Sequence, residues 1–352
     1  MSTPVSTKPP DATTDAPRPE RSLVSRAMTR PEFGAIAAAI VIFIFFFVVA
    51  PPFRTLPAFA TVLYASSTIG IVAVGVALLM IGGEFDLSSG VSVVTSALVA
   101  ALTVYQLSLN VWVGVVLSLV AALAIGFING WLVVRTGIPS FLITLATFFM
   151  LRGINLAVTK TITGTVASDN ISELDGFAAA KALFAADIPL GFITIKVTIL
   201  WWILFVILGT WILQRTRTGN WIFASGGNAA SARAVGVPVP RVKIGLFMGV
   251  GFLAWFYGMH LLFNSASVQS GLGVGNEFRY IIAAVVGGCL LTGGYGSAIG
   301  ASLGALIVGM AFIGIQFSGW NTDWRFLFLG VILLLAVLVN NLVRQRAEGA
   351  RR

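Results

Sequence analysis

The feature that most constrains this chain is a series of apolar runs, each close to 20 residues long, that recur between Phe33 and Asn340. Such runs cross a bilayer only as helices, because lipid offers no hydrogen-bond partner to a free backbone group. Charged residues make up 10% of the chain, whereas a soluble domain carries about 25%. The sequence therefore predicts an all-α polytopic membrane protein, and it lacks the alternating short segments of a β-barrel.

The runs predict about ten transmembrane helices within residues 31–343, flanked by two short tails. The eighth run is short, so the eighth and ninth could instead form a hairpin that does not cross, which leaves the sidedness unchanged. The expected spans are Phe33–Ala50, Ala58–Ile81, Leu87–Tyr105, Val111–Val134, a fifth that opens at Ile138, Gly191–Leu213, Ile244–Phe263, Phe278–Leu291, a ninth that ends near Phe317, and Trp324–Asn340.

The net charge of +9 comes from cations in the tails and short loops, which indicates membrane orientation rather than nucleic-acid binding. Residues 1–30 are rich in Pro, Thr and Ala and predict a disordered tail, and residues 344–352 form a basic tail. Arg30 precedes the first run and Arg344 follows the last, so we expect both termini in the cytoplasm. One cysteine and one histidine exclude a disulfide or a His/Cys metal site, and no cofactor or catalytic set is expected.

A basic stretch, residues 214–243, separates the sixth and seventh runs, and it contains no carboxylate. Asn228 is a good helix N-cap, and Gly236 stands where a helix-ending glycine belongs. Pro238 prevents the helix from continuing. This pattern predicts a short helix outside the membrane that a partner can grip, although an ordinary basic loop that only fixes topology is the competing interpretation. The cations are Arg215, Arg217, Arg233, Arg241 and Lys243.

The segment Ala224-Ser-Gly-Gly-Asn-x-x-x-Ala-Arg-x-x-Gly-Val237 resembles the cytoplasmic coupling loop of permease subunits in bacterial sugar ABC importers of the ribose/xylose/galactose type. Ala229 and Ala230 stand where that family often has acidic residues. The resemblance implies contact with a cytoplasmic ATP-binding subunit. The residues it assigns to this contact are Gly226, Gly227, Asn228, Ala232, Arg233 and Gly236.

Three further segments are similar to the same family, so the resemblance covers roughly residues 60 to 340. They are the turn Gly82-Gly-x-x-Asp-Leu-Ser-x-Gly90, the stretch from Pro139 to Gly153, and the glycine-rich segment Ala283–Ser297. The glycines permit tight reversals between spans, and Asp86 can cap the next helix. The expected structural-turn residues are Gly82, Gly83, Asp86, Ser88, Gly90, Gly293, Gly294 and Gly296.

Polar residues within the apolar runs are candidates for a transport pathway. Thr144 and Thr147 share one helix face, and with Asn129 and Asn155 they could line a polar route or simply bond neighbouring helices. Residues 159–190 form a mixed-charge connection that suits the outer face. Docking of an extracytoplasmic binding protein is the functional interpretation of that loop, and a passive loop is the alternative.

The chain has no ATP-binding motif, and its spans lack a series of acids and bases for proton coupling. The resemblance implies a permease subunit, not itself an enzyme, that carries a monosaccharide across the bacterial inner membrane. Its expected partners are cytoplasmic ATP-binding subunits, an extracytoplasmic sugar-binding protein, a second copy of the chain and the lipid bilayer. A permease for another solute, such as a branched-chain amino acid or a furanose-like signal, and a self-sufficient secondary carrier remain the alternatives.

Overall fold

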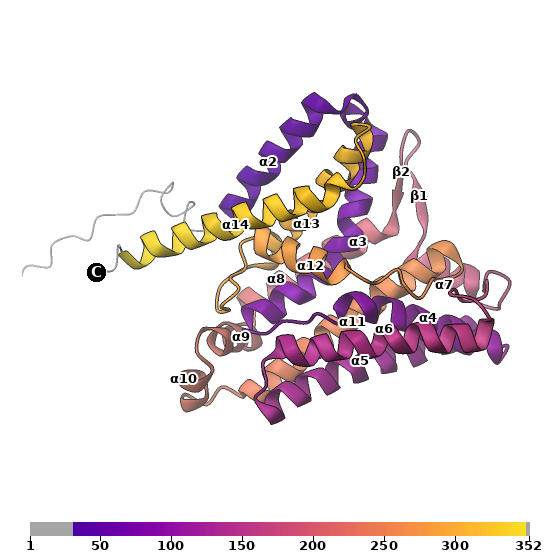
Figure 1. Ribbon diagram of the computed structural model, residues 1–352, viewed down its shortest axis with the longest axis horizontal. Coiled ribbons are helices and arrows are strands. Elements are labelled where there is room, and N and C mark those ends of the chain that lie inside the picture. The colour runs from indigo at the N-terminus through magenta and orange to yellow at the C-terminus, as the bar shows by residue number, and fades with distance from the viewer. Residues whose placement is uncertain (1–30, 350–352) are drawn as a thin grey trace, which may run out of the picture.

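Each long apolar run of the sequence forms a helix in the computed structural model, which describes residues 31–349 (Figure 1). Among these residues, seven helices are both long and apolar enough to cross a membrane. They are α3 (Leu56–Ile81), α4 (Ser89–Gln106), α5 (Val111–Thr136), α6 (Ser140–Thr163), α8 (Val197–Arg215), α11 (Val239–Ser265) and α13 (Ala298–Phe317).

Three other apolar helices complete the bundle. α2 (Pro31–Val49), which is followed by the 3-10 turn Pro51–Arg54, and α14 (Trp324–Gly349) contain shorter apolar stretches. α12 (Asn276–Val286) has 11 residues, about 16 Å of helix, and is too short to cross a bilayer alone. α14 continues beyond the expected span, so the predicted basic tail is helical as far as Gly349. The predicted disordered tail, residues 1–30, lies outside the described residues.

Both long polar connections contain regular structure, of which the sequence predicted only the short helix after Asn228. The first holds α7 (Phe177–Phe184) and an antiparallel hairpin of β1 (Asp187–Pro189) and β2 (Thr194–Lys196). The second holds α9 (Arg217–Gly227) and α10 (Ala229–Ala234). The two groups lie at opposite ends of the bundle (Figure 1). We call them the hairpin end and the basic end.

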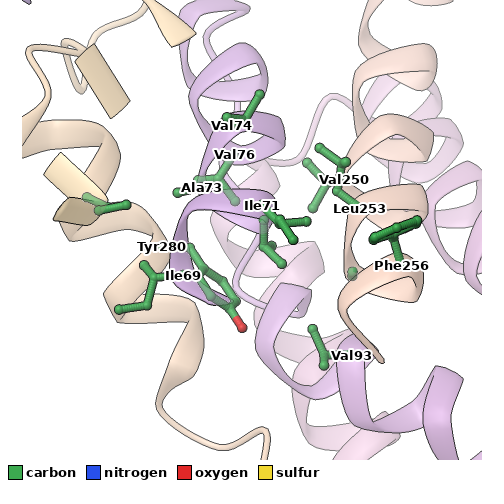
Figure 2. Packing of buried hydrophobic residues seen from close by; sticks show 14 of the residues in the cluster. Ile69, Ile71, Ala73, Val74, Val76, Val93, Val250, Leu253, Phe256 and Tyr280 are labelled. Atoms are coloured by element: carbon green, nitrogen blue, oxygen red, sulfur yellow. The ribbon is translucent and has the colours of Figure 1, made fainter. Parts of the chain in front are cut away.

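The centre of the bundle is formed by α3, α4, α11 and α13, whose side chains are mostly buried. α5, α6 and α8 expose most of their apolar surface, as expected of helices that face lipid or another chain. α3 lies between α11 and α12. Figure 2 shows Ile69 of α3 beside Tyr280 on one side, and Val250 and Leu253 on the other.

Two helices, α4 and α12, begin inside the bundle, each after a non-helical segment. The chain leaves α3 at the basic end, passes through residues 82–88, and enters α4 toward the hairpin end. It leaves α11 at the hairpin end, passes through residues 266–275, and enters α12 toward the basic end. The starts of α4 and α12 meet, since a Cβ atom at Gly90 would lie 2.6 Å from the Gly273 carbonyl oxygen. The α4 and α12 helices, each with the non-helical segment before it, therefore run in opposite directions, and their starts meet at the middle of the protein.

Candidate functional site

The basic end is built from two short helices that polar side chains cap. Thr216 accepts a hydrogen bond from the Gly219 amide at 3.1 Å and starts α9. Asn228 accepts from the amides of Ala230 and Ser231 at 3.0 and 2.9 Å and starts α10. Gly236 follows α10 with a positive φ of 86°, as a helix-ending glycine requires. The predicted capped helix is confirmed, whereas α9 was missed because its sequence contains two glycines at its end and one near its start.

The outer surface of α10 differs from its inner surface. Ala232 is buried and anchors the helix against the bundle. Arg233 is exposed, and its Nε atom donates to the Ala229 carbonyl oxygen at 3.2 Å. Val235 directly follows the helix and is 80% exposed. This apolar side chain, which the sequence analysis did not single out, projects from the basic end beside a cation.

Where α9 ends, its backbone packs directly on two glycine turns. A Cβ atom at Gly293 would lie 2.8 Å from the Gly226 carbonyl oxygen and 2.8 Å from the Gly83 Cα atom. The Gly294 amide donates to the Ile81 carbonyl oxygen at 2.8 Å. These backbones approach one another without side chains between them, which only glycine permits. We call this contact of Ile81, Gly83, Gly226, Gly293 and Gly294 the glycine junction.

A buried ion pair stands beside the glycine junction. Lys243 Nζ in the first turns of α11 donates to Glu84 Oε1 in the segment after α3. The side chain of Glu84 is 9% exposed and that of Lys243 is 19% exposed. The sequence analysis counted Lys243 among the loop cations, and the fold joins it to Glu84. This pair fixes the start of the 82–88 segment to α11.

Hydroxyl groups of α6 accept hydrogen bonds from backbone amides of the 82–88 segment, which have no helical partner. The Phe85 amide donates to Ser140 Oγ at 3.0 Å, and the Leu87 amide donates to Thr144 Oγ1 at 3.0 Å. A non-helical segment inside a membrane protein needs such partners, because each unbonded amide costs several kcal/mol in lipid. Thr144, a predicted pathway residue, therefore supports the segment.

A chain of buried hydrogen bonds continues from the segment into α5 and α6. Asp86 Oδ1 accepts from the amide and the hydroxyl of Ser88 at 2.8 and 2.5 Å. Ser88 Oγ accepts from Asn129 Nδ2 at 3.0 Å, and Asn129 Oδ1 accepts from Thr147 Oγ1 at 2.7 Å. Asp86 thus caps the turn before α4 by bonding the residue that precedes the helix. The polar groups of Asn129 and Thr147 are occupied by this chain.

Asn155, the fourth predicted pathway residue, stands apart from the other three. Its side chain is 4% exposed, and its Nδ2 atom has no hydrogen-bond partner within the described part of the chain. It lines a hollow of about 350 Å³ between α4 and α6.

Three other glycines that the sequence analysis named, two as turn residues and one as a coupling residue, lie around the glycine junction. Gly82 ends α3 with an ordinary helical φ of −69°. Gly227 is exposed, and a Cβ atom there would meet no other atom within 4 Å. Gly296 has a φ of 149° and lies against Cys289, where a side chain would not fit.

Comparison with known proteins places the sequence in a family. Residues 58–337 match the protein family described as branched-chain amino acid transport system / permease component. The chain is 31% identical to the ribose import permease protein of Escherichia coli strain K12, over 88% of this chain and 94% of that protein.

Two other relatives are also named for sugars. The galactose/methyl galactoside import permease protein of Haemophilus influenzae is 31% identical, over 83% of this chain and 88% of the relative. The fructose import permease protein of Rhizobium meliloti is 28% identical, over 81% of this chain and 78% of the relative. No solved structure matches the chain.

The glycine junction predicts a sharp difference between two neighbouring substitutions. Gly226→Ala places a methyl group against the Ile81 carbonyl oxygen, so it should destabilise the protein by about 3 kcal/mol through overpacking. Gly227→Ala places the same group in open space. Thermal unfolding of the purified protein in detergent should show a lower midpoint for Gly226→Ala alone. Equal midpoints for the two variants would contradict the assigned contact.

The ion pair predicts a recoverable loss of stability. Lys243→Met leaves the Glu84 carboxylate buried without its partner and should cost about 3 to 5 kcal/mol. The double variant Glu84→Gln/Lys243→Met removes both charges and should regain most of that loss. Arg241→Met, which changes an exposed cation two residues earlier, is the matched control. Chemical or thermal unfolding measures all three, and a double variant no more stable than Lys243→Met would contradict the assigned ion pair.

Proposed function

Since the chain belongs to the branched-chain amino acid transport system / permease component family, we propose that it is the membrane permease subunit of an ATP-binding-cassette importer for a monosaccharide. The observation that carries this proposal is the glycine junction, where a polar helix pair outside the apolar bundle rests on the backbone of the central helices. The names of the relatives favour a sugar as the solute. A branched-chain amino acid is the second candidate, because the family description names it.

We propose an inner-membrane topology of ten crossings with both termini in the cytoplasm. The seven long helices, α2 and α14 supply nine crossings, and residues 266–275 with α12 supply the tenth. The basic end carries Arg215, Arg217, Arg233 and Arg241, so the positive-inside rule assigns it to the cytoplasm. The hairpin end then faces outward. This order returns the chain to the cytoplasmic side after α14.

The surface around α10 suits a cytoplasmic ATP-binding subunit. Val235 offers an exposed apolar side chain and Arg233 a cation. Ala232 is buried and packs α10 against the bundle, so a displacement of α10 would also displace the helices that it contacts. Ala229 and Ala230 offer no carboxylate, so apolar contact and Arg233 carry the proposed binding.

The glycine junction supplies a route from this surface to the membrane interior. Gly226 contacts both glycine turns, and one turn adjoins α4 while the other adjoins α12. One turn opens the 82–88 segment before α4, and the other connects α12 to α13. Closure of the ATP-binding subunits would shift α9 and α10, and with them the meeting point of α4 and α12. Such a shift converts outward-facing and inward-facing states.

The other partners follow from the same assignment. A sugar-binding protein docks at the hairpin end, where α7 and the β1–β2 hairpin project. Two copies of the chain form the pathway between them, and α5, α6 and α8 expose the apolar surface that a second copy or lipid covers.

The contact with the ATP-binding subunit is tested by changing the exposed side chains of α10. Val235→Asp and Arg233→Glu should each reduce co-purification of the ATP-binding subunit and lower sugar uptake about tenfold or more, as expected of interface anchors. Replacement of residues 228–236 by a Gly/Ser linker should abolish both. Pull-down from mildly solubilised membranes measures the association.

Phe192→Asp is the matched control for that experiment. Phe192 is 76% exposed at the tip of the hairpin, and its substitution should leave the ATP-binding subunit bound. If this subunit associates equally with the linker variant, the assignment of α10 as the coupling element is wrong.

A further inference from the structure

The hollow between α4 and α6 is lined by one face of each helix. The lining residues of α4 are spaced three and four apart, and those of α6 have the same spacing. Its volume of about 350 Å³ lies within the range of small-molecule sites. The lining residues are Thr95, Leu98, Val99, Leu102, Thr103, Gln106, Leu107, Ile154, Asn155, Val158, Thr159 and Ile162.

Two buried polar groups on its wall have no partner in the described part of the protein. Asn155 Nδ2 and Thr159 Oγ1 make no hydrogen bond, and their side chains are 4% and 0% exposed. They lie four residues apart on α6, so both face α4. A buried polar group without a partner costs about 1 to 3 kcal/mol, so such groups signal a ligand or water that the protein itself does not supply.

The other three predicted pathway residues have hydrogen-bond partners. Thr144 bonds the Leu87 amide, and Asn129 and Thr147 bond one another. The polar residues near the basic end therefore serve the fold, whereas Asn155 Nδ2 and Thr159 Oγ1 at the hollow have no partner among the described residues.

The chemistry of the wall selects a neutral polyhydroxyl compound. Asn155, Thr159 and Gln106 offer donors and acceptors that match sugar hydroxyl groups. Leu98 and Val158 provide apolar surface for the C–H faces of a sugar ring. Among the described residues that line the hollow, none is charged. The ammonium and carboxylate groups of an amino acid would remain unpaired there, at a high desolvation cost.

The position of the hollow suits the outward half of the pathway. It follows α4 from its interior part to Gln106 at the hairpin end, and the second half of α6. Its open rim carries exposed Ile154 and Ile162. A polar wall that faced lipid would be costly, so the rim is placed to be covered by a second copy of the chain.

We infer that this hollow is an outer subsite for the monosaccharide, in which Asn155 and Thr159 hydrogen-bond the sugar after its release from the binding protein. The inference rests on the proposed function and names the residues that determine its solute.

The test replaces the two polar groups by apolar groups of similar shape. Asn155→Leu and Thr159→Val should leave the thermal midpoint unchanged or raised, because Asn155 Nδ2 and Thr159 Oγ1 make no hydrogen bond with the described residues. The double variant should lower ATP-driven sugar uptake at subsaturating sugar about tenfold, the effect of two modest hydrogen bonds. Proteoliposomes that contain the whole importer, with labelled D-ribose and D-galactose as probes, measure uptake.

Thr161→Val is the matched control, because Thr161 is exposed on the same helix and its hydroxyl bonds the Ala157 carbonyl oxygen of its own helix. It should leave uptake unchanged. Wild-type uptake by the double variant would overturn the subsite and leave the importer assignment intact. A lower thermal midpoint of the double variant would also overturn it, since the groups would then be structural. Failure of the wild-type importer to carry any sugar would overturn both proposals, and uptake of leucine in its place would identify the amino-acid alternative.

Discussion

The close backbone contact at the glycine junction is the constraint on which the rest of the structure depends. Gly226 at the end of α9 lies against the turn after α3 and the turn before α13. Side chains that separate two backbones can repack when one of them moves, whereas directly touching backbones must move together. The polar surface at the basic end is thereby connected to the segments that adjoin α4 and α12 without a long series of side chains. The adjacent Glu84–Lys243 pair extends this connection to α11.

The second constraint is that backbone amides in the interior need partners. The segment 82–88 is not helical, and hydroxyl groups of α6 bond its amides. This requirement explains why Ser140 and Thr144 lie in an otherwise apolar helix, and why Asn129 and Thr147 are buried together. Such a segment can be held in place by a few hydrogen bonds and released by their exchange, which suits a protein that alternates between two states. Asn155 Nδ2 and Thr159 Oγ1 are buried without a partner among the described residues, and in this they differ from the residues of the structural network.

The sequence predicted the helical membrane fold, the capped helix at Asn228 and the importance of the glycine turns, because apolar run length, N-cap residues and paired glycines are local signals. It expected a short eighth run at Phe278–Leu291, where α12 has 11 residues, and it found no regular apolar pattern in the preceding residues 266–275. It could not assign partners to Glu84 or Thr144, since these contacts join residues far apart in the chain. It also passed over Val235, because the exposure of one valine depends on how α10 sits on the bundle.

The most direct test of this account is the energy source for uptake. The chain should be reconstituted in liposomes with labelled D-ribose outside, either alone under an imposed proton or sodium gradient or together with its ATP-binding subunit and binding protein. We predict uptake only in the complete system, and only while ATP inside is hydrolysed. Uptake by the chain alone, driven by the ion gradient and unaffected by the absence of ATP, would contradict the account and identify the protein as a secondary carrier.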